Sequence, residues 1–536
     1  MMIRDVRQLR TGPFDVLIIG GGIYGSWMAR HAATAGLKVA LVEQSDWASA
    51  TSSASSKLLH GGLRYLERFE FGLVRRSLHE RRELNRIMPH HVRPLRFLLP
   101  VYRDSRVGRL KLKAGLWLYD RLAGSDQPVA GHQSYSASEL MAQEPGLSSD
   151  QLLGGFSYGD CGTDDARMVL EVVDSAISAG AAACNYVTAT ELLQQDNRVC
   201  GAVVRDEETN EQFRIKAAVV VNAAGPWIYQ PAELRSEADR VRLTKGVHLV
   251  MPPLQSDHAV LLTARSDGRV FFLIPWYGRT LLGTTDTDFD ADPSSARVEE
   301  ADIHYLLNAA NDYLRTPWTV EDIGGAFCGL RTLQNESGLS ASSVSREWLL
   351  EETRPGLFTS IGGKYTSARV DSLEAAQRVL RELHRWGNCT DRQLDWFPPA
   401  AFVDWQKRVC EEAVAVGIDR ETALNGTRRF GARLSDVIAI ARDQPALAKR
   451  IHPDFAFCMA EVAHTVSSEM ARTLVDILRR RIPLMLLTGV DRATVAAVSD
   501  VAGDLLNWTP ERRQQETDAV LQQTWSTANS STDPVS

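Results

Sequence analysis

The sequence predicts an α/β fold that begins with a βαβ unit, continues into an antiparallel sheet and ends in a helical domain. Three observations lead to this prediction. Residues 14–43 read as strand, helix and strand, residues 241–289 contain several short β-like runs separated by turn residues, and the chain after Trp396 is almost wholly helical in pattern. At 536 residues the chain is also too long for a single core, so two or three domains are expected.

The βαβ unit carries the spacing of a dinucleotide-binding site. A short apolar strand, 16–19, leads into Gly20, Gly22 and Gly25 at G-x-G-x-x-G spacing, and Glu43 follows the second strand. The first glycine permits a tight turn, the second permits close approach of a pyrophosphate, and the third permits close helix–strand packing. The helix N-terminus offers free N–H groups to phosphates, and the acid can accept hydrogen bonds from a ribose. We therefore predict a Rossmann-like dinucleotide site rather than an ordinary βαβ unit.

An unusual polar loop follows Glu43. Small hydroxyl residues fill 49–56, and Lys57, His60 and Arg64 crowd into the next nine positions together with two glycines and a tyrosine. Such a loop is suited to run along a bound cofactor, although a flexible Ser/Ala linker before a helix is the alternative.

Further motifs continue this pattern along nearly the whole chain. They are GGGIYG (20–25), ATSSASSKLLHGGLRYLE (50–67), FLLPVYR (97–103), GLWLYDRLAG (115–124), YGDCGTDDARMV (158–169), VVNAAGPW (220–227), RLTKGVHLVMP (242–252), FLIPWYGRTLLGTTDTDF (272–289), GLRTL (329–333) and SIGGKYTSAR (360–369). Together they resemble the FAD-dependent glycerol-3-phosphate dehydrogenases, the quinone-linked flavoproteins of glycerol catabolism.

The resemblance implies a D-amino-acid-oxidase-like flavoprotein whose FAD-binding domain is built from three segments. The expected divisions are FAD-binding segments 14–70, 151–240 and 329–390, a mostly helical cap segment 71–150, a substrate-capping β domain 241–328, a C-terminal helical domain 391–525 and a disordered tail 526–536. Phe397–Pro399 is the expected linker. Within these segments we expect strands at 218–222 and 357–361, a helix at 298–314, and Asp164 and Asp165 as the cap of a helix over 166–179.

The resemblance and the local patterns together predict the residues that contact FAD. The predicted set is Gly20, Gly21, Gly22, Ile23, Tyr24, Gly25, Glu43, Gln44, Thr51, Ser52, Ser55, Ser56, Lys57, Leu58, His60, Gly61, Gly62, Val187, Ala223, Gly225, Gly363, Lys364 and Thr366. Gly363 and Lys364 belong to a second glycine-rich turn between a strand and a helix, which can present N–H groups to an anion or a flavin edge.

The oxidation of a phosphorylated secondary alcohol requires a proton acceptor, positive charge beside the developing alkoxide, and a cationic phosphate site. Within the family motifs, Arg64, Tyr65 and Arg331 are expected to bind the phosphate and hydroxyls. His248 and Lys364 are both candidates for proton removal and alkoxide stabilisation, and the sequence does not decide between them. His60 is a weaker candidate that lies nearer the flavin.

Three positions depart from the family pattern. Val247 stands where a Ser is usual, Thr332 stands where a Pro is usual, and Thr366–Arg369 reads Thr-Ser-Ala-Arg instead of a Thr-Thr-Tyr-Arg run, with Ala368 in place of the tyrosine. All three lie near presumed substrate-binding segments. A related polyol phosphate, such as a four-carbon erythritol phosphate, therefore stays open as the substrate.

The resemblance also implies a membrane quinone as electron acceptor. Arg106, Arg109, Lys111 and Lys113 alternate with apolar residues and Trp117, as in a segment that lies on an anionic membrane surface. An ordinary surface helix is the alternative. We expect a cytoplasmic protein that is peripheral on the cytoplasmic face of the inner membrane, with a homodimer as an open expectation.

Composition excludes several other classes. A net charge of −7 without an aromatic-basic pattern argues against nucleic-acid binding. The seven scattered cysteines, with no C-x-x-C and no histidine pair at metal spacing, predict reduced thiols and no metal site. No apolar run has the length of a signal peptide or a membrane span. The arginines Arg479–Arg481, in a helical stretch over 462–487, are expected on a solvated or inter-domain face.

Three other functions compete with that of a quinone-linked dehydrogenase. An oxidase of the same fold would pass electrons to oxygen, and a non-catalytic flavin protein would act through its C-terminal domain. The presence of Arg64, His248, Arg331 and Lys364 argues against the latter. A nicotinamide dehydrogenase would need a second nucleotide-binding half, and the sequence has no second G-x-G-x-x-G followed by an acid.

Overall fold

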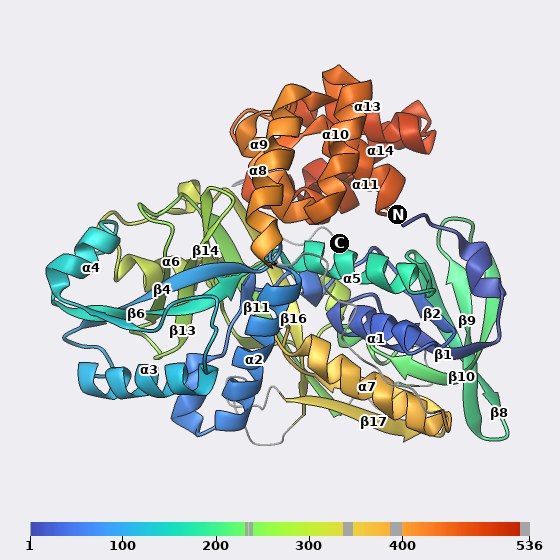
Figure 1. Cartoon of the computed structure of the whole chain (residues 1–536), viewed down its shortest axis with the longest axis horizontal. Helices are drawn as coiled ribbons and strands as arrows, with labels where there is room; N and C mark the ends of the chain where they lie inside the picture. The colour runs from blue at the N-terminus through green and yellow to red at the C-terminus, as the bar shows by residue number, and fades with distance from the viewer. Residues whose placement is uncertain (1, 231–233, 235–239, 336–346, 386–398, 526–536) are drawn as a thin grey trace.

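The structure is a computed structural model that describes residues 2–230, 234, 240–335, 347–385 and 399–525. Two large sheets lie side by side, and a helical C-terminal domain covers the junction between them (Figure 1). Residues 397 and 398 of the predicted linker and the predicted tail 526–536 lie outside the described residues.

The first sheet has a parallel centre, as expected for the predicted dinucleotide fold. Its strand order is β17 (Trp348–Arg354), β18 (Leu357–Gly362), β10 (Gln212–Asn222), β1 (Phe14–Ile19), β2 (Val39–Val42) and β7 (Ala182–Cys184). Strands β8 (Val187–Gln195) and β9 (Arg198–Asp206) extend β10 as an antiparallel meander. The strands predicted at 16–19, 38–42 and 357–361 are confirmed within two residues, and the strand predicted at 218–222 is confirmed at its end but begins earlier, at Gln212.

Alternation along β1 divides the core into two layers. Val16 and Ile18 pack among residues of three helices, α1 (Ile23–Thr34), α5 (Asp165–Ser178) and α7 (Ala368–Glu382), whereas Leu17 and Ile19 pack among those of the β8–β9 meander. Asp164 caps α5 by accepting a hydrogen bond from the Arg167 backbone N–H, which confirms the predicted helix cap.

The second sheet is mostly antiparallel. Its order is β15 (Thr287–Asp288), β11 (Val241–Met251), β14 (Arg279–Gly283), β13 (Val270–Trp276), β12 (Ala259–Thr263), β4 (Arg93–Tyr102), β6 (Leu152–Gly162) and β3 (Leu58–Leu59), with β16 (Gly325–Gln334) beside β11 and β5 (Gln133–Tyr135) beside β6. The antiparallel strands predicted within 241–289 are confirmed.

This sheet also takes strands from segments that were predicted to lie elsewhere. Segment 71–150 was expected to be mostly helical, but β4 crosses the middle of the sheet, and β6 comes from a segment assigned to the FAD-binding domain. The apolar run 97–101 forms β4 because β6 and β12 pair with it on either side, a long-range cause that no local pattern reveals. Pro100 interrupts the run and obscured it in the sequence.

Helices lie along this sheet and at its junction with the first sheet (Figure 1). They are α2 (Phe71–Ile87), α3 (Arg109–Ala123), α4 (Ala137–Gln143) and α6 (Glu300–Asn311), the last of which confirms the helix predicted over 298–314. Within the described part of the chain, no helix combines the length and the apolar character needed to cross a membrane.

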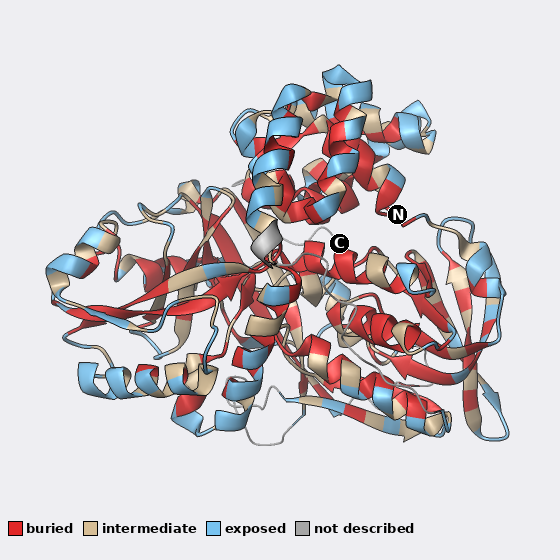
Figure 2. Cartoon of the chain, viewed as in Figure 1, coloured by how far each residue is buried: buried red, intermediate tan, exposed pale blue. Residues whose placement is uncertain are grey.

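The C-terminal domain is helical, as predicted, except for a short hairpin. Its helices are α8 (Pro399–Ala415), α9 (Arg420–Phe430), α10 (Leu434–Asp443), α11 (Met459–Ser468), α12 (Leu484–Leu487), α13 (Arg492–Leu506) and α14 (Pro510–Gln523), and β19 (Arg450–His452) pairs with β20 (Phe455–Cys458). Residues 476–481 form a π-helix. Figure 2 shows the buried residues of this domain gathered toward the rest of the molecule. Arg480 and Arg481 are buried there. Of the two faces expected for these arginines, the inter-domain face is therefore correct and the solvated face is wrong.

Candidate active site

A cavity of about 360 Å³ lies between the two sheets. It begins where β1, β10 and β18 end, because the carboxyl ends of parallel strands meet at one edge and leave a crevice there. It reaches β11 and β16 of the second sheet. The predicted residues that line it are Gly20, Gly22, Ile23, Tyr24, Glu43, Gln44, Thr51, Ser52, Ser55, Ser56, Leu58, His60, Gly62, Val187, Ala223, Gly225, Gly363, Lys364 and Thr366, together with Arg64, Tyr65, His248 and Arg331.

The glycines of the first turn have the predicted geometric roles. Gly20 has a φ of 112°, and a Cβ there would lie 2.5 Å from the carbonyl oxygen of Ala223. A Cβ on Gly25 would lie 1.9 Å from the carbonyl oxygen of Gly20, so a side chain would force α1 away from the turn. Gly22 is the N-cap of α1 and leaves the helix N-terminus open to the cavity.

Glu43 is joined directly to this turn. Its carboxylate accepts hydrogen bonds from the backbone N–H groups of Gly21, at 2.6 Å, and Ser45, at 2.9 Å. Burial raises the pKa of Glu43, while these two backbone donors act in the opposite direction. The residue also lines the cavity, in the position from which a carboxylate can receive a ribose hydroxyl.

The Ser/Thr-rich loop forms one wall of the cavity. Ser52 Oγ accepts a hydrogen bond from the Ile23 N–H at 3.0 Å, and Thr51 donates to the carbonyl oxygen of Leu330 at 2.6 Å. The loop therefore connects the first turn of α1 with β16, and the alternative of a flexible linker is wrong.

Four residues of the predicted cofactor set do not line the cavity. Gly21 and Gly25 shape the turn behind it. Lys57 is buried and forms an ion pair with Asp165 at 2.5 Å, and Gly61 donates its N–H to Tyr119. All four support the cavity wall. Residues that line the cavity and residues that support it from behind occur within the same motifs, so the sequence could not distinguish them.

His248 lies on β11 with its ring against the cavity. Ser56 Oγ is 2.9 Å from His248 Nε2, and the ring stacks on Phe327 at 5.0 Å between centroids. Burial lowers the pKa of His248 to about 3, with the positive charges of Arg331 and Lys57 adding to the effect. The imidazole is therefore neutral in the substrate-free protein at neutral pH.

Arg331 extends from β16 toward the same part of the cavity. Its guanidinium forms an ion pair with Asp286 at 3.1 Å and donates to Thr284 Oγ1 at 3.2 Å and the Thr285 carbonyl at 3.3 Å. Asp286 and Thr284 also line the cavity and were not predicted as site residues. The GTTDTD run that contains them was quoted as a motif, but its role depends on the pairing of β11 with β14, which the sequence does not show.

Lys364 approaches the cavity from the second glycine turn. Its Nζ lies 3.8 Å from the centre of the Tyr65 ring, a cation–π distance. Tyr24 supports this turn from behind, since its hydroxyl lies 3.2 Å from the Lys364 carbonyl oxygen and 2.9 Å from Asp371. Gly363 has a φ of 94° and packs against the same hydroxyl, so both glycine turns meet at Tyr24.

The remaining predicted residues complete one end of the cavity. Arg64 lies over Tyr65 at 5.2 Å, and the His60 N–H donates to Thr366 Oγ1 at 3.2 Å. Arg269, which was not predicted, also lines the cavity and donates to the Asp286 carbonyl oxygen at 2.9 Å. The sequence only weakly indicates Arg269 as a site residue, because a lone arginine after an Asp-Gly turn is typical of any exposed hairpin.

The three departures from the family pattern lie in different surroundings. Val247 and Ala368 are fully buried in apolar clusters and do not line the cavity, whereas Thr332 does. Val247 points away from the cavity because neighbouring residues on a strand face opposite sides, and His248 faces the cavity. Of the three departures, Thr332 is the one that can influence the substrate directly.

No metal site was predicted, and the described residues contain one group that has the right donors. His90, His91 and Glu171 lie within 4.8 Å of one another, all buried. Arg433 donates to the same Glu171 carboxylate at 2.6 Å and pairs with Asp174 at 2.7 Å. We assign the cluster to ion pairing between α5 and the C-terminal domain, because a cation would have to compete with a guanidinium already in contact.

The cavity fits FAD by the shape of its backbone. Two glycine turns bend too tightly for a Cβ and border the cavity, the N-terminus of α1 opens into the space, and the hydroxyl-rich wall connects them. FAD would occupy the part of the cavity between Glu43 and Lys364, with the cationic residues beyond.

The comparisons with known proteins agree with this architecture. Residues 15–388 match the FAD dependent oxidoreductase family, and residues 395–513 match the C-terminal domain of alpha-glycerophosphate oxidase. The chain is 37% identical to glycerol-3-phosphate dehydrogenase 2 of Mycobacterium tuberculosis over 94% of this chain and 86% of that protein. It is 33% identical to the aerobic glycerol-3-phosphate dehydrogenase of Staphylococcus aureus over 96% and 95%.

Solved structures show the same fold. The glycerol-3-phosphate dehydrogenase of Bacillus halodurans, solved with FAD, superposes with a TM-score of 0.78 at 27% identity, covering 97% of this chain and 96% of that one. An L-alpha-glycerophosphate oxidase of Mycoplasma pneumoniae with FAD bound shares the fold, with a TM-score of 0.54 at 19% identity, over 69% and 94%. The chain therefore belongs to the family of FAD-dependent glycerol-3-phosphate dehydrogenases, which have a D-amino-acid-oxidase-like fold, and its cofactor is FAD.

Proposed function

We propose that this enzyme oxidises sn-glycerol 3-phosphate to dihydroxyacetone phosphate. The observation that supports this most strongly is that Arg64, Arg331 and Lys364 line the same cavity as a neutral His248 and the first glycine turn. Bound FAD supplies the two-electron acceptor for the hydride that leaves C2 of the substrate. The chain itself must bind the phosphate, orient the alcohol and accept its proton.

The phosphate would be held by Arg331 and Arg64, with Tyr65 between Arg64 and Lys364. A guanidinium suits this role because its planar N–H groups match two phosphate oxygens. Arg331 enters the cavity already oriented by Asp286 and Thr284, so little side-chain freedom is lost when the substrate binds.

His248 is our candidate for the proton acceptor. It is neutral in the substrate-free protein, and Ser56 holds Nε2 by a hydrogen bond. A base with a pKa near 3 would be weak, but the negative charge of the substrate phosphate offsets the effect of Arg331 and Lys57 and raises that pKa on binding. Lys364, held in a cation–π contact, is then the group that stabilises the developing alkoxide.

We further propose a membrane quinone as the electron acceptor. A second cavity of about 480 Å³ lies beside the first and shares Leu63, Arg64, Leu261 and Val270 with it. Its wall is largely apolar, and α3 lies along it. An apolar cavity that adjoins the active site is suited to the ring of a quinone.

The surface around this second cavity supports peripheral membrane contact. Leu110 and Trp117 of α3 are 88% and 59% exposed, and nearby Phe69 is 77% exposed. Lys111 and Lys113 flank them on the same helix. An exposed apolar stripe between basic residues is typical of a helix that lies in the interface of an anionic membrane, here the cytoplasmic face of the inner membrane.

Substrate and acceptor can be tested in steady state with purified FAD-loaded protein. We expect sn-glycerol 3-phosphate to be oxidised in the presence of a short-chain quinone, with little peroxide formed in air. Rapid peroxide production without quinone would instead identify an oxidase. A higher kcat/KM for erythritol phosphate would assign the second substrate candidate and point to Thr332 as its determinant.

A further inference from the structure

The turn after Glu43 folds back onto the glycine turn. Ala48 donates its N–H to the Gly21 carbonyl oxygen at 3.2 Å, and the Trp47 ring packs on Gly21, where an added Cβ would lie 2.4 Å from it. The Glu43 carboxylate in turn accepts a hydrogen bond from the Gly21 N–H. The segment 43–48 is thus a second layer that fixes the cofactor end of the cavity from behind.

Asp46 is at the centre of this layer and is fully buried. Its carboxylate receives hydrogen bonds from Arg480 at 2.5 Å, from Nη1 and Nη2 of Arg481, and from Asn185 at 3.1 Å. Burial would raise the pKa of Asp46, but the two arginines outweigh it and hold that pKa below its usual value. Asp46 is therefore an ionised carboxylate whose charge is balanced by another domain.

Both arginines belong to the π-helix of the C-terminal domain. Arg480 also pairs with Asp476, and Arg481 donates to the carbonyl oxygen of Glu469 at 2.8 Å. A π-helix adds one residue to a turn, which here lets two consecutive arginines reach one carboxylate. None of the residues 469–481 lines the cavity. The C-terminal domain reaches the cofactor end through the turn 43–48 and through the neighbouring Asn185 and Tyr186, which donate to the Met470 carbonyl oxygen and to Asp476.

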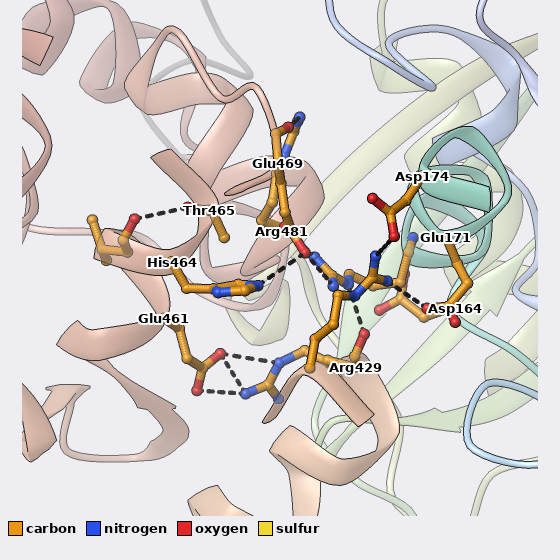
Figure 3. Close-up of polar contacts among 12 residues, drawn as sticks. Asp164, Glu171, Asp174, Arg429, Glu461, His464, Thr465, Glu469 and Arg481 are labelled. Carbon is orange, nitrogen blue, oxygen red and sulfur yellow. Dashed lines mark hydrogen bonds and ion pairs between the residues drawn. The ribbon is translucent and has the colours of Figure 1, made fainter. Parts of the chain in front are cut away.

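The contact continues into the body of the C-terminal domain. The Glu469 carboxylate binds Arg167 of α5 in a bidentate pair at 2.6 and 2.7 Å, and Arg167 donates to the Arg429 carbonyl oxygen at 2.9 Å. Arg429 in turn pairs with Glu461 (Figure 3). Figure 3 shows Glu469 and Arg481 together with this pair and with Glu171 and Asp174 of α5.

We propose that the C-terminal helical domain retains FAD by holding the turn 43–48 through Asp46. Asp46, Arg480 and Arg481 are then positioning residues for the cofactor. The inference rests on the assignment of the Glu43 end of the cavity to the FAD nucleotide. Removing one charge of a buried, hydrogen-bonded ion pair leaves the other charge without compensation. The turn should then shift, and Glu43 and Trp47 should lose their contacts with Gly21.

The test compares two isosteric substitutions in full-length protein. Asp46→Asn and Glu461→Gln each remove one carboxylate charge from a buried pair with arginine, but Glu461 lies within the C-terminal domain, away from the turn. Both should lower thermal stability. We expect Asp46→Asn alone to raise the Kd for FAD, by at least about tenfold in a flavin fluorescence titration, with Glu461→Gln within twofold of the unsubstituted protein. Equal Kd values for the two variants would overturn the proposal.

Glu43→Gln distinguishes this proposal from the assignment on which it rests. If Glu43→Gln weakens FAD binding and Asp46→Asn does not, the inter-domain role is wrong while the cofactor site stands. If neither changes the Kd, both are wrong.

A second measurement needs no substitution and so does not depend on the variants folding. Hydrogen exchange of the full chain, with and without FAD, should show slower exchange in residues 469–481 when FAD is bound, although this segment does not line the cavity. An exchange rate in residues 469–481 that does not change when FAD binds would contradict the proposal.

Discussion

At the scale of single residues, Arg331 is the best-defined candidate for phosphate binding. Arg331→Ala should raise the KM for sn-glycerol 3-phosphate by roughly 10- to 150-fold, because hydrogen bonds to a charged group contribute about 1.5–3 kcal/mol. FAD should remain bound, since Arg331 is not among the predicted cofactor contacts and the glycine turns stay unchanged. The measurement is steady-state kinetics with the flavin content determined in parallel.

Arg242→Ala provides the matched control for this substitution. Arg242 lies on β11, beside the strand that carries Arg331, and pairs with Asp288 away from the cavity. The KM of the Arg242→Ala enzyme for sn-glycerol 3-phosphate should stay within twofold of that of the unsubstituted enzyme. An unchanged KM in Arg331→Ala would remove that residue from the phosphate site.

The low pKa of His248 predicts the shape of the pH profile. Because the free enzyme keeps His248 neutral above about pH 3, its ionisation should not appear in kcat/KM between pH 5 and 8. The substrate phosphate itself gains a proton near pH 6. A plot of log kcat/KM should therefore fall below pH 6 with a slope of one, and a slope of two would show a histidine that titrates at its ordinary value.

At the scale of elements, the first βαβ unit could be predicted from the sequence because each of its causes is local. The glycine spacing, the two apolar strands and Glu43 all lie within thirty residues, and the Gly25 contact with Gly20 is enforced by the turn itself. Strand β4 could not be predicted in this way, because its partners β6 and β12 are far away in the sequence.

Gly25→Ala tests the packing of α1 on the turn. The new methyl group would lie 1.9 Å from the Gly20 carbonyl oxygen, so we expect a loss of stability of about 1–3 kcal/mol, or more, and loss of bound FAD. Gly72→Ala is the control, because a Cβ there meets nothing within 4 Å at the start of α2. Thermal denaturation and flavin content after desalting measure both effects. FAD retention in Gly25→Ala would contradict the assigned role of this turn.

Helix α3 carries the prediction about the membrane. Lys111→Glu with Lys113→Glu should weaken co-sedimentation with anionic vesicles at least about 30-fold, since each basic residue near such a surface contributes about 1 kcal/mol. Lys407→Glu with Lys449→Glu changes the same charge on the C-terminal domain, on the far side of the molecule from α3, and should have little effect (Figure 1). Equal loss in both variants would show that net charge, rather than α3, governs the contact.

At the scale of the whole molecule, the order of the motifs along the chain could be predicted from the sequence better than the side-chain contacts between distant segments. His248, Arg331 and Lys364 were identified because each lies in a family motif, and the fold brings these motifs together. The contacts of Asp46 with Arg481 and of Arg331 with Asp286 were missed, since each joins residues that have no local pattern in common. The His90, His91 and Glu171 cluster was missed for the same reason.

The two sheets and the C-terminal domain together build the site. The first sheet supplies the glycine turns, the second supplies His248 and Arg331, and the C-terminal domain packs against the second sheet through apolar residues such as Trp276, Phe327 and Leu486. His248 and Arg331 therefore reach the glycine turns and Lys364 from a different layer, and the cavity exists because these layers are held together.

The central claim is that one cavity holds FAD and a phosphorylated alcohol in position for hydride transfer. The most direct test is the visible spectrum of the FAD-loaded protein before and after anaerobic addition of sn-glycerol 3-phosphate. We predict that the flavin absorbance bleaches on mixing and that dihydroxyacetone phosphate appears in equal amount. A flavin spectrum that stays unchanged at saturating sn-glycerol 3-phosphate would contradict the proposed activity.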